Sequence, residues 1–278
     1  MKLFSSLVLL LLFAPSSTLA GNEPAVTAVD SGSFGIFVSS KRTATERFSV
    51  EQNSDGSLVT TDFKTEESNG AHQTTELKLG ATGDLRRYEF KDIAPGSAQA
   101  VLEPKDEFMV QHSTLLPTDK PEEHQYILPA TTSVLDDFVF VHREVLAWRF
   151  LAIGCRQKDG QIQCPLKKKL NIGVVIPRSR TSMLVGVEYS GRDSVSIHGK
   201  ARELNLFVLK SETSDWQLWL DDDYKVMRMV IPDLSTEIVR VQPVGQTSDV
   251  EERHRQSGYT SNLQQSSEML TGRRAPLG

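Results

Sequence analysis

The stretch Thr132–Ile153 reads TSVLDDFVFVHREVLAWRFLAI, and it is the only long segment outside the N-terminus with a strongly helical pattern. Its residues form two adjacent rows in which intervals of four and three alternate, so each row lies along one side of an α-helix. The first row is Val134, Phe138, Val141, Val145, Trp148 and Ala152, and the second is Leu135, Val139, His142, Leu146, Arg149 and Ile153. Two largely apolar rows are wider than the stripe of a surface helix, so we expect this helix to be buried on most of its circumference.

The ends of this expected helix, residues 132–153, carry helix-terminating residue types. Thr132 or Ser133 is a suitable N-cap, two aspartates follow in the first turn, and Gly154 is a suitable stop. About 20 residues at 1.5 Å each give a rod of roughly 30 Å. A membrane span is excluded because charged and polar residues interrupt the run, namely Asp136, Asp137, His142, Arg143, Glu144 and Arg149.

The first twenty residues have the organisation of a secretory signal peptide. Lys2 is the basic start, residues 7–14 form an unbroken apolar run, and Thr18–Ala20 offers small residues for cleavage. We therefore expect residues 1–20 to be removed and the protein to work in the periplasm or outside the cell. No other run of membrane length follows, so no transmembrane segment is expected in the mature chain.

The charge balance narrows the range of partners. The formal net charge is −5, a mild acidity that argues against nucleic acid and against an anionic membrane surface as the main partner. The two cysteines, Cys155 and Cys164, enclose a short loop with a turn sequence at 158–160. In an exported chain such a pair predicts a disulfide that links the two strands of a hairpin.

Most of the remaining chain predicts short β-strands separated by turns. The alternation of apolar and polar residues indicates strands with one buried and one wet face. Before the helix we expect strands at 32–38, 44–52, 57–65, 72–79, 85–91, 97–102 and 106–112, and after it at 170–176, 182–189, 194–199, 201–210, 216–220, 224–231 and 236–242. A connector is expected at 116–123. Residues 21–243 thus predict a single β-rich domain, and the polar residues 244–278 predict a disordered tail.

Motifs of catalysis and metal binding are missing from the sequence. It contains no GxSxG, no HExxH and no glycine-rich phosphate loop, and its histidines are scattered. His142 is the most suggestive residue because it lies in an otherwise mainly apolar row. Its more ordinary interpretation is a core or rim histidine that is hydrogen-bonded to a backbone carbonyl. No catalytic residue, metal or cofactor is therefore expected.

Several segments together resemble a group of uncharacterised exported bacterial β-proteins. They are RFSVEQ (47–52), GSLVTTDFK (56–64), VLDDFVFVHREVLAWRF (134–150), Ile176-Pro177 and WQLWLDDDYKVMRMVIP (216–232). The architecture also resembles, more distantly, the open β-barrels of periplasmic lipoprotein carriers, with a helix in the hollow. That likeness implies binding of acyl chains or peptides, although a shared fold does not determine a function.

The expected fold is mainly β, a curved antiparallel sheet or open half-barrel wrapped around one long central helix. The leading hypothesis is a non-enzymatic exported protein that binds a hydrophobic or lipidic ligand, or an envelope partner, in the concavity beside the helix. Two alternatives are a structural or interaction module with a filled core and a hydrolase with a dispersed site. The candidate ligand-binding residues are His142, Arg149, Trp148, Leu146 and Phe138.

Overall fold

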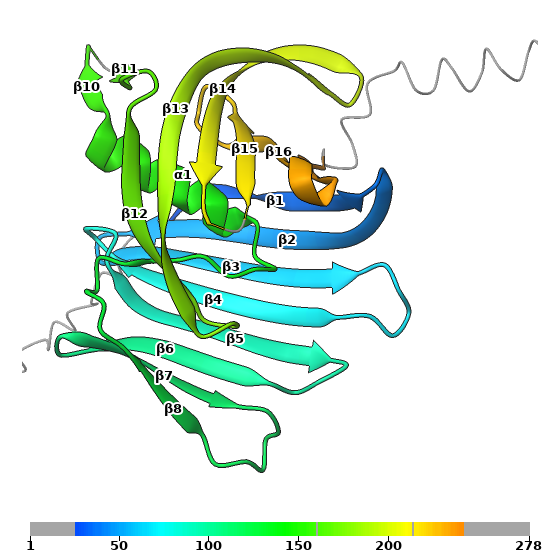
Figure 1. Cartoon of the computed structure of the whole chain (residues 1–278), viewed down its shortest axis with the longest axis vertical. Coiled ribbons are helices and arrows are strands. Elements are labelled where there is room, and N and C mark those ends of the chain that lie inside the picture. The colour runs from blue at the N-terminus through cyan, green and yellow to red at the C-terminus, as the bar shows by residue number, and fades with distance from the viewer. Residues whose placement is uncertain (1–25, 160, 213, 242–278) are drawn as a thin grey trace, which may run out of the picture.

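The computed structural model describes residues 26–159, 161–212 and 214–241 (Figure 1). The expected signal peptide and the expected tail at 244–278 lie outside these residues. The described elements are β1 Thr27–Val38, β2 Lys41–Asn53, β3 Gly56–Thr65, β4 His72–Gly80, β5 Leu85–Ala94, β6 Gln99–Lys105, β7 Phe108–Thr114, β8 Glu122–Tyr126, β9 Ser133–Val134, α1 Val141–Gly154, β10 Arg156–Lys158, β11 Gln161–Gln163, β12 Lys169–Ile176, β13 Thr181–Ile197, β14 Lys200–Lys210, β15 Asp215–Leu220, β16 Val226–Ile231, the 3-10 turn η1 Pro232–Leu234 and β17 Thr236–Arg240. The expectation of a mainly β protein is confirmed.

Fifteen of the described strands form one sheet with a simple topology. Its order is β8-β7-β6-β5-β4-β3-β2-β1-β17-β16-β15-β14-β13-β12-β9. The chain therefore runs outward from β1 to β8, crosses to the other edge at β9, and returns from β12 to β17. The first and last strands pair at the centre, where Phe34 lies opposite Arg240. The one parallel pair in this sheet is β9 with β12.

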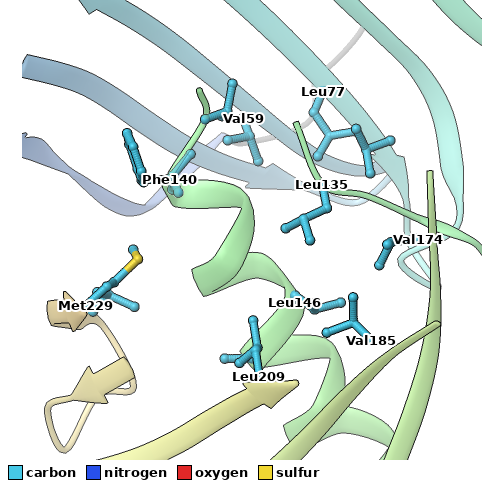
Figure 2. Close-up of a cluster of buried hydrophobic side chains, with 14 of the residues drawn as sticks. Val59, Leu77, Leu135, Phe140, Leu146, Val174, Val185, Leu209 and Met229 are labelled. Atoms are coloured by element: carbon cyan, nitrogen blue, oxygen red, sulfur yellow. The ribbon is translucent and has the colours of Figure 1, made fainter. Parts of the chain in front are cut away.

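The sheet curves around α1, so the helix has strands on opposite sides (Figures 1 and 2). Val59 and Leu77 approach it from β3 and β4, while Val185 and Leu209 approach from β13 and β14 (Figure 2). On the helix, Phe150 is completely buried, as are several neighbours in the same cluster. The expectation that the sheet wraps around a central helix is therefore confirmed.

Side chains connect the two ends of the curved sheet. The turn between β12 and β13 carries Arg178 and Arg180, which reach strands of the first half. The Arg178 Nη2 donates to Gln73 Oε1 at 2.6 Å, and the Arg180 Nη2 donates to Ser113 Oγ at 2.9 Å. The buried Gln111 donates its Nε2 to the Pro177 carbonyl at 3.0 Å. This seam of polar contacts holds the edge of the sheet near β12 against β4 and β7.

The helix is shorter than the sequence predicts. It begins at Val141 rather than Thr132, because Ser133 and Val134 pair with β12 as strand β9. Residues 135–140 then turn toward the helix without joining it. The expected N-caps Thr132 and Ser133 are therefore wrong, whereas the expected stop is confirmed, because Gly154 is the last helical residue. Within the described residues, no helix is long and apolar enough to cross a membrane.

The disulfide prediction and most strand predictions are confirmed, with differences at β8, β9 and β13. Cys155 and Cys164 form a disulfide with an S–S distance of 2.07 Å, directly after α1, and the hairpin of β10 and β11 lies between them. The sequence misses β8, which begins inside the expected connector 116–123. It also divides β13 in two, although this strand continues through an irregularity between Tyr189 and Gly191.

Candidate functional site

An apolar cavity of about 630 Å³ lies at the N-terminal end of α1, between the two halves of the sheet. We call it the main cavity. Its volume is in the range of small-molecule sites, which is roughly 300–1,000 Å³. Its lining comes from β1 to β3, from the approach to the helix, and from β12 to η1, and includes Ile36, Ala44, Phe63, Leu135, Phe140, Val185, Leu209 and Trp216. Residues far apart in the sequence therefore form one apolar space.

The rim of the main cavity exposes large apolar side chains. Phe138 is 46% exposed just before the helix, and Leu234 is 60% exposed in η1. Phe138 also packs near Phe63, with ring centroids 5.8 Å apart, and lies near the guanidinium of Arg178. Apolar groups that remain in contact with water around an apolar hollow are typical of a binding site.

Glu46 on β2 caps the N-terminus of α1 from a distant part of the chain. Its carboxyl oxygens accept hydrogen bonds from the backbone N–H groups of Phe140 at 2.8 Å and Val141 at 3.3 Å. These are two of the N–H groups that a helix leaves without internal partners. Glu46 is fully buried, and this burial raises the pKa of its carboxyl to about 8. The carboxyl is therefore mainly protonated at neutral pH.

Asp136 organises the turn that leads into the helix. Its side chain is fully buried and accepts a hydrogen bond from the Tyr88 hydroxyl, and its Oδ1 lies 3.5 Å from Arg178 Nε. Its backbone N–H donates to His142 Nδ1 at 3.2 Å, and its carbonyl accepts from Arg143 Nη1. This single residue therefore fixes the positions of both His142 and Arg143.

Among the described residues that line the main cavity, Arg143 is the one cationic side chain. It is only 4% exposed, and its guanidinium carbon lies 4.4 Å from the centre of the Trp216 ring and 5.8 Å from that of Phe140. Burial lowers the pKa of Arg143 to about 10, so the side chain remains charged at neutral pH. The acidic side chain in the same lining is Asp137, whose pKa is raised by partial burial.

The predicted site residues are divided between two places. Phe138 lines the main cavity. The other four, His142, Leu146, Trp148 and Arg149, line a second space of about 320 Å³ between α1, the ends of β2 to β4 and the turn after β4, which we call the side groove. The structure therefore brings four of the five candidate residues together and places Phe138 in a different space.

His142 does not match its ordinary interpretation in detail. It is buried, as that interpretation requires, but its Nδ1 accepts a hydrogen bond from a backbone N–H instead of donating one to a carbonyl. Its Nε2 has no hydrogen-bond partner among the described residues. Burial and the nearby charge of Arg143 lower the pKa of His142 to about 3, so the imidazole is neutral at neutral pH.

The remaining side-groove residues are held by hydrogen bonds to backbone carbonyls. Arg149 donates through Nη1 to the Gly83 carbonyl at 2.9 Å, and Trp148 donates through Nε1 to the Tyr224 carbonyl at 2.6 Å. Leu146 is almost completely buried. These three side chains therefore already serve the packing of α1. Among the described residues, no cluster of three His, Cys, Asp or Glu side chains is suited to hold a metal.

Sequence reasoning missed the two polar features that distinguish the main cavity. In the sequence, Arg143 served only as evidence against a membrane span. Glu46 was not considered as a site residue, because it lies in an expected strand. Trp216 lies on the inner face, whereas Trp219 packs in a separate cluster on the outer face. Alternation within the strand could have placed Trp216 inward, but nothing local could have paired it with Arg143.

Comparison with known proteins adds a likeness in fold. No protein-family model matches the sequence, and no curated protein matches it. Among solved structures, the chain is similar to the crystal structure of a β-barrel-like protein of domain of unknown function DUF1849 from Brucella abortus. The two share 9% sequence identity, with 76% of this chain and 95% of that chain covered and a TM-score of 0.47. That structure is of an uncharacterised bacterial β-protein.

Proposed function

We propose that this chain is an exported, non-enzymatic protein that binds a hydrophobic or lipidic ligand in the main cavity. The observation that supports this most is an apolar space of about 630 Å³ whose rim exposes Phe138 and Leu234. Exposing these side chains to water costs free energy that a bound apolar ligand recovers. The leader at residues 1–20 supports the proposed export.

The two other hypotheses have less support. A module with a filled core is favoured by the tight packing around Ala147 and Phe150 on the inner side of α1, but the main cavity lies beyond that packing. A hydrolase needs a base placed beside a nucleophile. His142 is neutral with a strongly lowered pKa, and its Nδ1 is occupied by the Asp136 backbone.

The direct test is to identify what the protein carries. Full-length protein purified from its native compartment is extracted with organic solvent, and the extract is analysed by mass spectrometry. We expect an acyl-chain species in stoichiometric amount. A protein that yields no such species, and that also fails to bind the neutral apolar dye N-phenyl-1-naphthylamine, would contradict the proposal.

Replacing Leu234 with glutamate is expected to weaken dye binding at least about tenfold, because the change places a charge at the apolar rim. The free energy of unfolding should change by less than about 0.5 kcal/mol, since the side chain is exposed. Leu115→Glu is the matched control. Leu115 is 68% exposed but does not line the main cavity. Fluorescence titration should find equal affinities for this control and the unaltered protein.

Replacing Ala44 with phenylalanine is expected to fill part of the main cavity. Ala44 is buried on β2 and lines that space, so the new ring has room and the free energy of unfolding should fall by less than about 1 kcal/mol. Dye affinity should drop about tenfold or more. Ala100→Phe, at a buried site on β6 outside the cavity lining, should instead lose about 1–3 kcal/mol through overpacking. Equal losses of stability in the two variants would argue against an empty space beside Ala44.

A further inference from the structure

Arg143 is a buried cation with unused hydrogen-bond donors. Both acceptors of its Nη1 are backbone carbonyls, those of Asp136 and of Val139, the latter at 2.7 Å. Its Nε is buried and has no partner among the described residues. No hydrogen bond from Nη2 to a described residue is formed either. Buried donors are almost always paired, so the unpaired Nε is unusual, and Nη2, which is not among the buried unpaired atoms, remains accessible to an acceptor.

The unused donors lie on one edge of the guanidinium. The N–H of Nε and one N–H of Nη2 point in parallel, which is the geometry that binds the two oxygens of a carboxylate. The guanidinium carbon lies over Trp216, and both Trp216 and Phe140 line the main cavity beside Arg143. Arg143 therefore forms part of the cavity wall, with Nε buried and Nη2 as the donor that a ligand reaches first.

The charge of Arg143 is also incompletely balanced, because Asp137, the carboxyl that acts on it most strongly, forms no ion pair with it within 4.0 Å. Among the described residues, Arg143 forms no ion pair within 4.0 Å. Asp136 is engaged by Tyr88 and Arg178, and Glu46 is mainly protonated at neutral pH, because burial raises the pKa of its carboxyl. A buried charge without a counterion is costly, and an anion that enters the cavity would remove that cost.

We propose that Arg143 binds the carboxylate of a long-chain carboxylic acid, whose apolar chain occupies the main cavity. This assignment rests on the proposed function and names the ligand class. A phosphate monoester is a poorer match, because it carries about −1.5 to −2 charges at neutral pH. The described part of the cavity lining offers one cation, Arg143, and also contains the acidic Asp137.

The test compares three ten-carbon amphiphiles that differ only in the head group. Delipidated full-length protein is loaded with N-phenyl-1-naphthylamine at pH 7.5, and the dye is displaced by decanoate, 1-decanol or decyl phosphate. We expect decanoate to bind about 10–100-fold more tightly than decanol, as a charged hydrogen-bonded pair does relative to a neutral group. Decyl phosphate should bind more weakly than decanoate.

Two variants then test whether Arg143 is responsible for the preference for decanoate. Arg143→Lys keeps the charge but loses the two-pronged edge, so the preference for decanoate should fall to less than about threefold while dye binding remains. Arg149→Lys, on the same helix in the side groove, is the matched control and should keep the full preference. Circular dichroism confirms that both variants fold, and the head-group comparison on the unaltered protein needs no variant.

The outcomes separate this inference from the proposed function. Equal binding of decanoate and decanol, a preference for decyl phosphate, or a full preference in Arg143→Lys would each overturn the role of Arg143 while leaving apolar ligand binding intact. Failure of the dye and of all three amphiphiles to bind would overturn the proposed function itself.

Discussion

Replacing Asp136 with alanine is expected to lower the free energy of unfolding by about 3–5 kcal/mol, the largest loss that we predict for a single residue. The side chain is fully buried, accepts from the Tyr88 hydroxyl and lies against Arg178. Its removal leaves the buried Tyr88 hydroxyl without its acceptor, and it takes away one of the two carboxylates that lie beside Arg178. Urea denaturation, followed by tryptophan fluorescence, measures the loss.

Two further variants should lower the free energy of unfolding by smaller amounts than Asp136→Ala. Tyr88→Phe removes one buried hydrogen bond and should cost about 1–1.5 kcal/mol. Asp92→Ala removes a carboxylate that also binds Arg178, but this group is partly exposed, so a loss of about 1 kcal/mol or less is expected. If Asp136→Ala lowered the free energy of unfolding no more than Asp92→Ala, the stability of the buried turn would not depend on the Asp136 side chain.

Replacing Glu46 with glutamine is expected to change how stability depends on pH. The folded-state pKa of Glu46 is about 8, above the ordinary value of 4.5, because burial disfavours the charged form. Protonation of Glu46 therefore stabilises the fold fully below about pH 4.5, and this contribution is lost as the pH rises through about 8. Relative to Glu46→Gln, the unaltered protein should lose up to about 5 kcal/mol between pH 4.5 and 8, since one pKa unit corresponds to about 1.4 kcal/mol.

The measurement is the difference in unfolding free energy between the two proteins from pH 5 to pH 9. Taking the difference removes most of the contributions of groups that the two proteins share, including the acid-side contribution of His142. That histidine has a folded-state pKa of about 3, lowered from 6.5, so its contribution is present above pH 6.5 and is lost as the pH falls through 3. Glu51→Gln is the control. Glu51 is an odd number of residues from Glu46 along β2, so its side chain lies on the other face of the sheet. A difference that does not vary with pH would show that Glu46 is ionised in the fold.

The strands could be predicted from the sequence because alternation is a local signal. In β2, Ala44, Phe48 and Val50 face inward at even spacing, and this pattern is visible without any partner. The start of the helix could not be predicted, because Ser133 and Val134 have an alternative partner in β12, forty residues downstream. The apolar periodicity continues through the turn at Asp136, so periodicity alone extends the helix too far.

The candidate site was only partly predictable for a similar reason. The sequence indicates that polar residues on an apolar helix are unusual, and this reasoning selected His142 and Arg149. It could not show that Arg143, one position further, lies over Trp216, because that contact depends on the curvature of the sheet. The cap provided by Glu46 joins residues 94 positions apart and leaves no trace in either segment.

The pairing of β1 with β17 also determines when the protein can fold. A side-chain hydrogen bond from Arg240 to Asp30, at the centre of the sheet, connects positions separated by 210 residues. A ribosome must therefore synthesise nearly the whole described chain before the two halves can join. Such distant pairing slows folding, because a long loop must close first. A nascent chain that stays open until its last strand emerges can pass through a narrow secretion channel as a thread, in agreement with the proposed export.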